Sequence, residues 1–113
     1  MNVIKLNEKF INLDHLGTRE SGKVLRAELE QSTKSHETLF IDFSGISDIT
    51  QSFCDEAFGV IVRTKGFEFF KRHIKIQNAS SEVKSVLKFV VNYSEFDRLQ
   101  AIKPQKKKEF FHH

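Results

Sequence analysis

The 113-residue sequence contains no tryptophan, one cysteine and one proline. A single cysteine excludes an internal disulfide and suits a reducing compartment, so we expect a cytoplasmic protein. Cys54 lies among apolar residues at helical spacing, which predicts a small buried side chain, because reactive thiols need exposed and electropositive surroundings. No apolar run approaches the roughly 18 residues that a membrane-spanning helix requires, so we expect no membrane partner.

Motifs for common enzyme chemistry are also missing. The sequence has neither a phosphate-binding loop nor the glycine pattern of a dinucleotide site. No cysteines and histidines stand at the spacing of metal ligands. We therefore expect no cofactor and no metal centre.

The net charge of +3 is unevenly distributed. Residues 1–102 contain fourteen basic and fourteen acidic side chains, and the excess of lysine lies in residues 103–109. We predict one domain over residues 1–102, followed by a basic, disordered tail over residues 103–113. A lysine-rich tail also suits a nucleic-acid-associated accessory protein, which is one alternative function, although such tails are more often simply solvated.

The chain is organised around residues 38–62, which contain a strand, a polar loop and a helix. Residues 39–43 are apolar on both alternating sets, which predicts a strand covered on both faces. The helix is predicted over residues 52–66, with Ser52 as its N-cap and Asp55 completing a capping box. Gly66 is its stop signal.

Further elements are expected on either side of this stretch. Residues 3–6 and 10–13 alternate in polarity and suit an edge hairpin, and Thr18 caps a helix that ends near residue 31. A strand follows over residues 73–77, then a helix from Ser80 or Ser81 to residue 92 or 93, and residues 96–102 form a helical turn or a short edge strand. This order predicts an α/β domain with a mixed central β-sheet of about four to five strands and three main helices.

Polar side chains gather where the strand over residues 39–43 ends. Asp42 precedes the turn Ser44-Gly45, so we expect its carboxylate to accept hydrogen bonds from the loop. With Asp48, Asp55 and Glu56 it forms a local group of carboxylates of the kind that binds a cation or acts as acid and base. Such carboxylates more often cap loops and helices, so an enzyme using Asp42, Asp55 and Glu56 is the second alternative function.

Arg19 lies in the first turn of the helix after Thr18, where a positive charge opposes the helix dipole. A carboxylate across the end of the sheet would hold it there, and the candidates are Asp42, Asp55 and Glu56. The alternative is a solvated arginine, since surface ion pairs are common and contribute little.

The central stretch resembles a STAS domain, the fold of anti-sigma-factor antagonists and of sulphate-transporter tails. Residues 42–46 (DFSGI) match the strand end and turn of that family, and Ser52 falls on the serine that a partner kinase phosphorylates there. Thr50, Gln51 and Phe53 stand in place of the other three motif residues. With the later string SFCDE, the pattern is similar to a bacterial subgroup, the STAS-like domains of unknown function, over about residues 3–93.

The resemblance implies the STAS architecture and a small cytoplasmic regulatory module that binds a protein partner and is not an enzyme. That partner would be a histidine-kinase-like ATPase or a related anti-sigma-type regulator. It would contact residues 44–51 and the exposed side of the following helix. The resemblance makes Ser52 a possible phospho-acceptor, whereas the residues alone make it only a helix cap.

Overall fold

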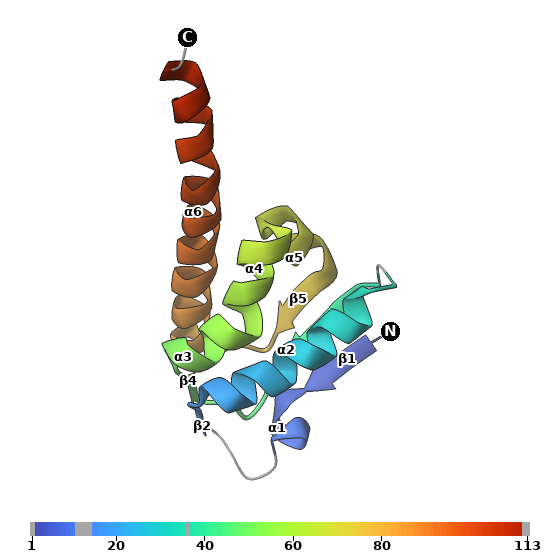
Figure 1. Cartoon of the computed structure of the whole chain (residues 1–113). Coiled ribbons are helices and arrows are strands. Elements are labelled where there is room, and N and C mark those ends of the chain that lie inside the picture. Colours follow the sequence, from blue (N-terminus) through green and yellow to red (C-terminus); the bar gives the residue numbers. More distant parts are fainter. Residues whose placement is uncertain (1, 11–14, 36, 112–113) are drawn as a thin grey trace.

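The structure, a computed structural model, describes residues 2–10, 15–35 and 37–111, with side chains over residues 2–10, 17–35 and 37–102. Strands and helices follow one another along the chain (Figure 1). They are β1 (Asn2–Lys5), α1 (Leu6–Lys9), β2 (His15–Leu16), α2 (Arg19–Thr33), β3 (Leu39–Asp42), β4 (Asp48–Ile49), α3 (Gln51–Cys54), the π-helical segment η1 (Asp55–Gly59), α4 (Val60–Lys65), α5 (Phe67–His73), β5 (Ile74–Gln77) and α6 (Ser81–Phe111).

The central sheet consists of three parallel strands in the order β1-β3-β5. Ile4, Ile41 and Ile76 lie in register on one face, which packs on the helices. Phe40 lies on the other face and is only partly buried, and its neighbours Val3 and Lys75 are exposed. The prediction that both faces of residues 39–43 are covered is therefore wrong. The connections β1 to β3 and β3 to β5 step in the same direction, and right-handed crossovers then place their helices on one face.

The predicted mixed sheet with an antiparallel hairpin at its edge is also wrong, because every strand pair formed by the described residues is parallel. Leu6–Lys9 forms the short helix α1 in place of a hairpin turn, and the Leu6 side chain is buried in the core. Residues 11–13, part of the predicted second hairpin strand, lie outside the described residues. A separate parallel pair joins β2 to β4.

The central helix, made of α3, η1 and α4 in succession, packs against both α2 and α6. Gly22 allows α2 to approach closely, because a Cβ atom there would lie 2.6 Å from the Phe53 carbonyl oxygen and 2.8 Å from Cβ of Glu56. At Gly59, a Cβ atom would lie 2.9 Å from the Ser94 hydroxyl of α6. Helices α2 and α6 therefore each contact the central helix at a glycine, where the absence of a side chain allows close packing.

Phenylalanine rings fill much of the space between the sheet and the helices. Phe53 and Phe58 are fully buried, and Phe58 meets Phe70 edge to face at a centroid distance of 5.9 Å. Cys54 is buried as predicted, and this burial, together with the charge of Asp55, raises the pKa of its thiol to about 12. The thiol therefore stays protonated at neutral pH, which confirms that it acts as a small core residue.

One predicted boundary shifts at β5. The strand begins at Ile74, and His73 is the last residue of α5, where it is buried against the Phe69 ring. The next helix starts as predicted, because the Ser80 hydroxyl accepts a hydrogen bond from the Val83 N–H at 3.2 Å.

Helix α6 does not end near residue 93 as predicted, but continues through residues 96–102 to Phe111. Glu95 and Arg98 form an ion pair at 2.7 Å, and Glu95 also accepts a hydrogen bond from the Phe67 N–H. These contacts tie the middle of α6 to the start of α5, and no proline interrupts the helix before residue 104. The division into a domain and a tail at residue 102 stays a prediction. Among the described residues, no helix is both long and apolar enough to cross a membrane.

Candidate functional site

The central helix starts two residues earlier than the sequence suggested. Thr50 has an extended backbone, and its hydroxyl accepts a hydrogen bond from the Phe53 N–H at 3.1 Å, so Thr50 is the N-cap. The predicted capping box of Ser52 and Asp55 is therefore wrong. Threonine and serine are both good caps, and the pairing of β4 with β2 keeps the chain extended up to Ile49, which favours the earlier start.

Ser52 lies in the first turn of this helix, at a groove of about 380 Å³. Its side chain is partly exposed, and within the described part of the chain its hydroxyl has no hydrogen-bond partner. The groove lies between the start of the central helix, the start of α2 and one side of α6. Its lining residues are Arg19, Gln51, Ser52, Asp55, Phe89, Val90 and Tyr93.

Asp55 connects three helices beside this groove. One carboxylate oxygen accepts a hydrogen bond from Arg63 at 2.7 Å, and the other accepts one from Arg19 of α2 at 3.4 Å. The same Arg63 nitrogen donates to the Ser94 hydroxyl of α6 at 3.1 Å. The carboxylate therefore couples the position of α2 and α6 to the central helix.

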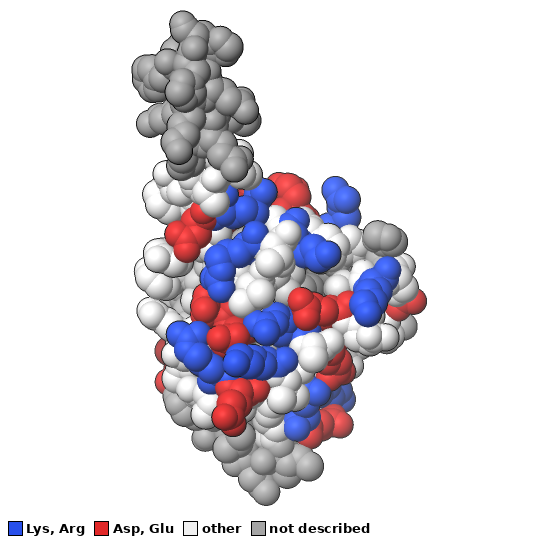
Figure 2. Space-filling model, in the orientation of Figure 1, with Lys and Arg blue, Asp and Glu red and all other residues white. Residues whose placement is uncertain are grey.

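Glu56 makes a second set of contacts to α2. Arg26 donates to its carboxylate at 2.9 Å and to its backbone carbonyl at 2.8 Å, and Arg19 donates to the other carboxylate oxygen at 3.2 Å. The prediction that a carboxylate holds Arg19 in place is confirmed for Asp55 and Glu56. Figure 2 shows the basic and acidic side chains interleaved on this face of the molecule.

Both carboxylates are held in the charged state. Burial acts to raise the pKa of Asp55, but the hydrogen bonds and charges of Arg63 and Arg19 outweigh it, so the net pKa is lowered. The pKa of Glu56 is lowered mainly by its hydrogen bond from Arg26. A general acid that works at neutral pH needs a raised pKa. The lowered pKa values of Asp55 and Glu56 therefore suit ion pairs that hold the helices together better than they suit proton transfer.

Asp42 belongs to a different group of contacts. Its carboxylate accepts hydrogen bonds from the Ser44 N–H at 2.9 Å, the Ser44 hydroxyl at 2.7 Å and the Asn78 side chain at 3.0 Å. These hydrogen bonds lower the pKa of Asp42, and the bond from the Ser44 hydroxyl has the largest effect. The predicted role of Asp42 as an acceptor for the loop is confirmed.

The predicted site residues thus divide into two groups. Asp42, Ser44, Gly45 and Asp48 shape the loop: Gly45 adopts a φ of +80°, and Asp48 accepts from the Ile49 N–H at 2.9 Å. The second group surrounds the start of the central helix and consists of Arg19, Ser52, Asp55 and Glu56. Within the described part of the chain, no three histidine, cysteine, aspartate or glutamate side chains come together as a metal site.

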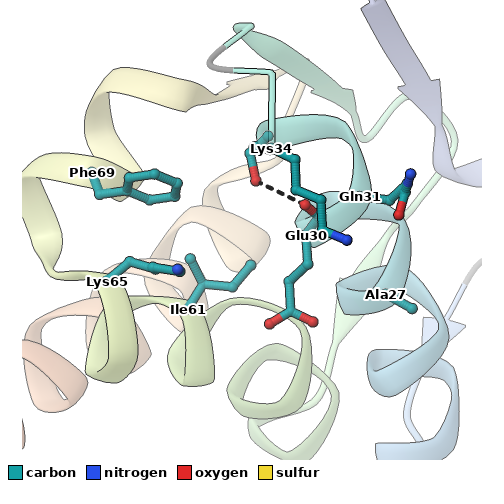
Figure 3. A pocket seen from close by; sticks show the side chains of 8 residues that line it. Ala27, Glu30, Gln31, Lys34, Ile61, Lys65 and Phe69 are labelled. Carbon is teal, nitrogen blue, oxygen red and sulfur yellow. Dashed lines mark hydrogen bonds between the residues drawn. The ribbon is translucent and has the colours of Figure 1, made fainter.

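A larger groove of about 580 Å³ lies elsewhere, between the second half of α2, α4 and α5 (Figure 3). The Phe69 ring and the Ile61 side chain provide its apolar part, and Glu30, Lys34 and Lys65 its charged part. None of the residues that the sequence singled out lines this groove. The smaller groove at Ser52 is therefore the candidate site.

The aromatic wall of the groove at Ser52 was not predicted from the sequence. Phe89 and Tyr93 stack with a centroid distance of 6.2 Å and are 54% and 55% exposed. The apolar residues that recur at helical spacing in this segment predict a core-facing stripe, which consists of Val83, Val86, Leu87, Val90 and Val91. Phe89 and Tyr93 lie outside that stripe at a spacing of four, and this offset is the signal that identifies them.

Comparison with known proteins agrees with the resemblance in the sequence. Residues 21–84, more than half of the chain, match a family described as a STAS-like domain of unknown function. No curated protein and no solved structure matches the chain.

Replacement of the observed cap should cost more than replacement of the predicted one. Thr50→Ala should lower the free energy of unfolding by about 0.5–2 kcal/mol, because it leaves the Phe53 N–H without its acceptor. Ser52→Ala is the matched control and should change it by less than about 0.5 kcal/mol. Urea denaturation followed by circular dichroism measures both. A larger loss for Ser52→Ala would contradict this assignment of the cap.

Protonation of Asp55 and Glu56 should destabilise the fold. Because their folded-state pKa values are lowered, their stabilisation is complete above the ordinary values of 3.8 and 4.5 and is lost as the pH falls through the folded values. The free energy of unfolding should therefore decrease as the pH is lowered below about 5. Asp55→Asn should show a smaller fall, because an amide takes up no proton in this range.

The control for this pH series is Glu20→Gln, which changes an exposed carboxylate in the first turn of α2. It should keep the wild-type dependence on pH. If Asp55→Asn also keeps it, the arginine contacts of Asp55 do not stabilise the folded state.

Proposed function

Because the chain belongs to the family of STAS-like domains of unknown function, we propose that it is a small cytoplasmic regulatory module that binds a protein partner and is not itself an enzyme. The partner class comes from the resemblance to anti-sigma-factor antagonists: a histidine-kinase-like ATPase or a related regulator. The contact surface is the loop over residues 44–51 together with the groove at Ser52.

The groove at Ser52 is the observation that carries the proposal. It combines an available hydroxyl, the cationic Arg19 and the exposed ring of Tyr93 in one shallow surface. Tyrosine and arginine are enriched among the residues that dominate protein–protein binding. A groove of this size with an aromatic wall suits an inserted side chain or short segment of a partner.

Ser52 is suited to act as the switch of this surface. Its hydroxyl is not occupied by capping, since Thr50 has that role. A phosphate there would add about −1.5 to −2 charges at a helix N-terminus, which favours anions. It would attract Arg19 and repel Asp55, two groups that contact each other in the unmodified protein. Phosphorylation would therefore change both the charge of the groove and the contacts of α2.

The enzyme alternative has less support. Asp42, Asp55 and Glu56 all have lowered pKa values, and Asp42 shares no hydrogen-bonding partner with the other two among the described contacts. Catalytic acid–base pairs instead combine carboxylates whose environments push their pKa values apart.

The proposal can be tested with the histidine-kinase-like ATPases of the source organism, each purified and titrated against the full chain by isothermal titration calorimetry. At least one should bind, Ser52→Ala should bind as well as wild type, and Ser52→Asp should bind at least about 10-fold more weakly, because the added charge imitates phosphate. If none binds, the proposed partner class is wrong.

The same ATPase, given ATP, should transfer phosphate to the wild-type protein and not to Ser52→Ala. Ser85→Ala, which removes an exposed serine of α6, is the control and should still be phosphorylated. Binding that is unaffected by Ser52→Asp, with phosphate transferred to another residue, would overturn the role of Ser52.

A further inference from the structure

Helix α6 extends well beyond the rest of the fold. The molecule measures 59 × 28 × 23 Å, and its radius of gyration of 15.6 Å exceeds the ~13 Å expected for a compact chain of this length. Figure 1 shows the second half of α6 standing clear of the body. Single helices are only marginally stable in water, so a projecting helix gains from a partner along its length.

An apolar stripe lies on the exposed side of this helix. Phe89, Tyr93 and Phe96 follow one another at spacings of four and three, and they are 54%, 55% and 59% exposed. Val86, three residues before Phe89, continues the stripe and is partly buried against the core. Spacings of three and four in alternation are those of the two seam positions of a coiled coil.

The side of α6 that faces the body uses other residues. Val83, Leu87, Val90 and Val91 are buried in the core, and the buried Ser94 contacts Arg63. The rings of Phe89, Tyr93 and Phe96 therefore remain exposed while α6 is packed on the domain. A second helix can lie on them without displacing any contact described above.

We propose that this stripe is the contact surface for a second copy of the chain, with the two α6 helices paired in antiparallel orientation. The three rings are each about half exposed, and aromatic side chains bury 150–250 Å² each, so two copies facing each other bury on the order of 600 Å² from these rings. The rings alone would supply about half of the roughly 1,200 Å² at the lower end of stable interfaces.

Charge determines the orientation of the pair. The sequence places four lysines and a single glutamate in residues 103–109, on the last part of α6. A parallel pair would set these lysines beside those of the other copy, where like charges repel. An antiparallel pair separates them.

Sedimentation equilibrium of the full chain tests the pairing. Wild type should form a dimer, and Phe96→Glu should raise its dissociation constant at least about 10-fold, because it places a charge in the apolar contact. Phe89 and Tyr93 belong to both surfaces, but Phe96 does not line the groove at Ser52, so Phe96→Glu leaves the lining residues of that groove unchanged. Val24→Glu is the matched control, since Val24 is an exposed apolar residue of α2, and it should dimerise like wild type.

A wild-type chain that stays monomeric to about 100 μM overturns the proposal, as does a dimer that Phe96→Glu leaves intact. Circular dichroism should show that Phe96→Glu keeps its helix content. If this variant unfolds, Phe96→Ser replaces it in the same measurement, with the same expected weakening.

Cysteine crosslinking tests the orientation, because the native Cys54 is buried and does not react. With a short bis-maleimide, Asn92→Cys should give crosslinked dimers, since this position lies near the symmetry axis of an antiparallel pair centred between Phe89 and Tyr93. Gln100→Cys should not, because the two copies of that position are then about 27 Å apart along the helices. Efficient crosslinking of Gln100→Cys would overturn the antiparallel arrangement.

Discussion

Two adjacent carboxylates in the middle of the central helix, Asp55 and Glu56, fix the helices that surround the candidate site. Arg19 and Arg26 of α2 contact these carboxylates. Arg63 contacts both Asp55 and the Ser94 hydroxyl of α6. The Glu56 side chain is only 16% exposed, so its contacts are stronger than those of ordinary surface pairs. Removing one partner would leave a partly buried charge uncompensated, which costs more than the pair contributes.

The parts of the fold that depend on local pattern were predictable. The strand that ends at Asp42, the cap at Thr18 and the start of the last helix after Ser80 each follow from a few neighbouring residues. The parallel pairing of β1 was not predictable in this way, because it depends on β3, more than thirty residues later in the chain. The length of α6 was missed for a similar reason, since Glu95 is held by a distant N–H.

Prediction of the site succeeded where charge was decisive. A first-turn arginine is stabilised by a nearby carboxylate, and this reasoning named Asp55 and Glu56 among the candidate partners of Arg19, with a solvated arginine as the alternative. The predicted N-cap of the central helix was wrong, because Thr50 and Ser52 are chemically similar and the pairing of β4 with β2 decides between them. That failure matters for function, because it leaves the Ser52 hydroxyl available at the groove.

The contacts described above imply that the carboxylates of the central helix are energetically coupled to the arginines of α2. A double-mutant cycle with Glu56→Gln and Arg26→Met measures this coupling directly, using the free energy of unfolding of the four proteins. We expect the loss of stability in the double variant to differ from the sum of the two single losses by about 1 kcal/mol or more. Additivity within about 0.3–0.5 kcal/mol would show that these side chains meet without holding the helices together.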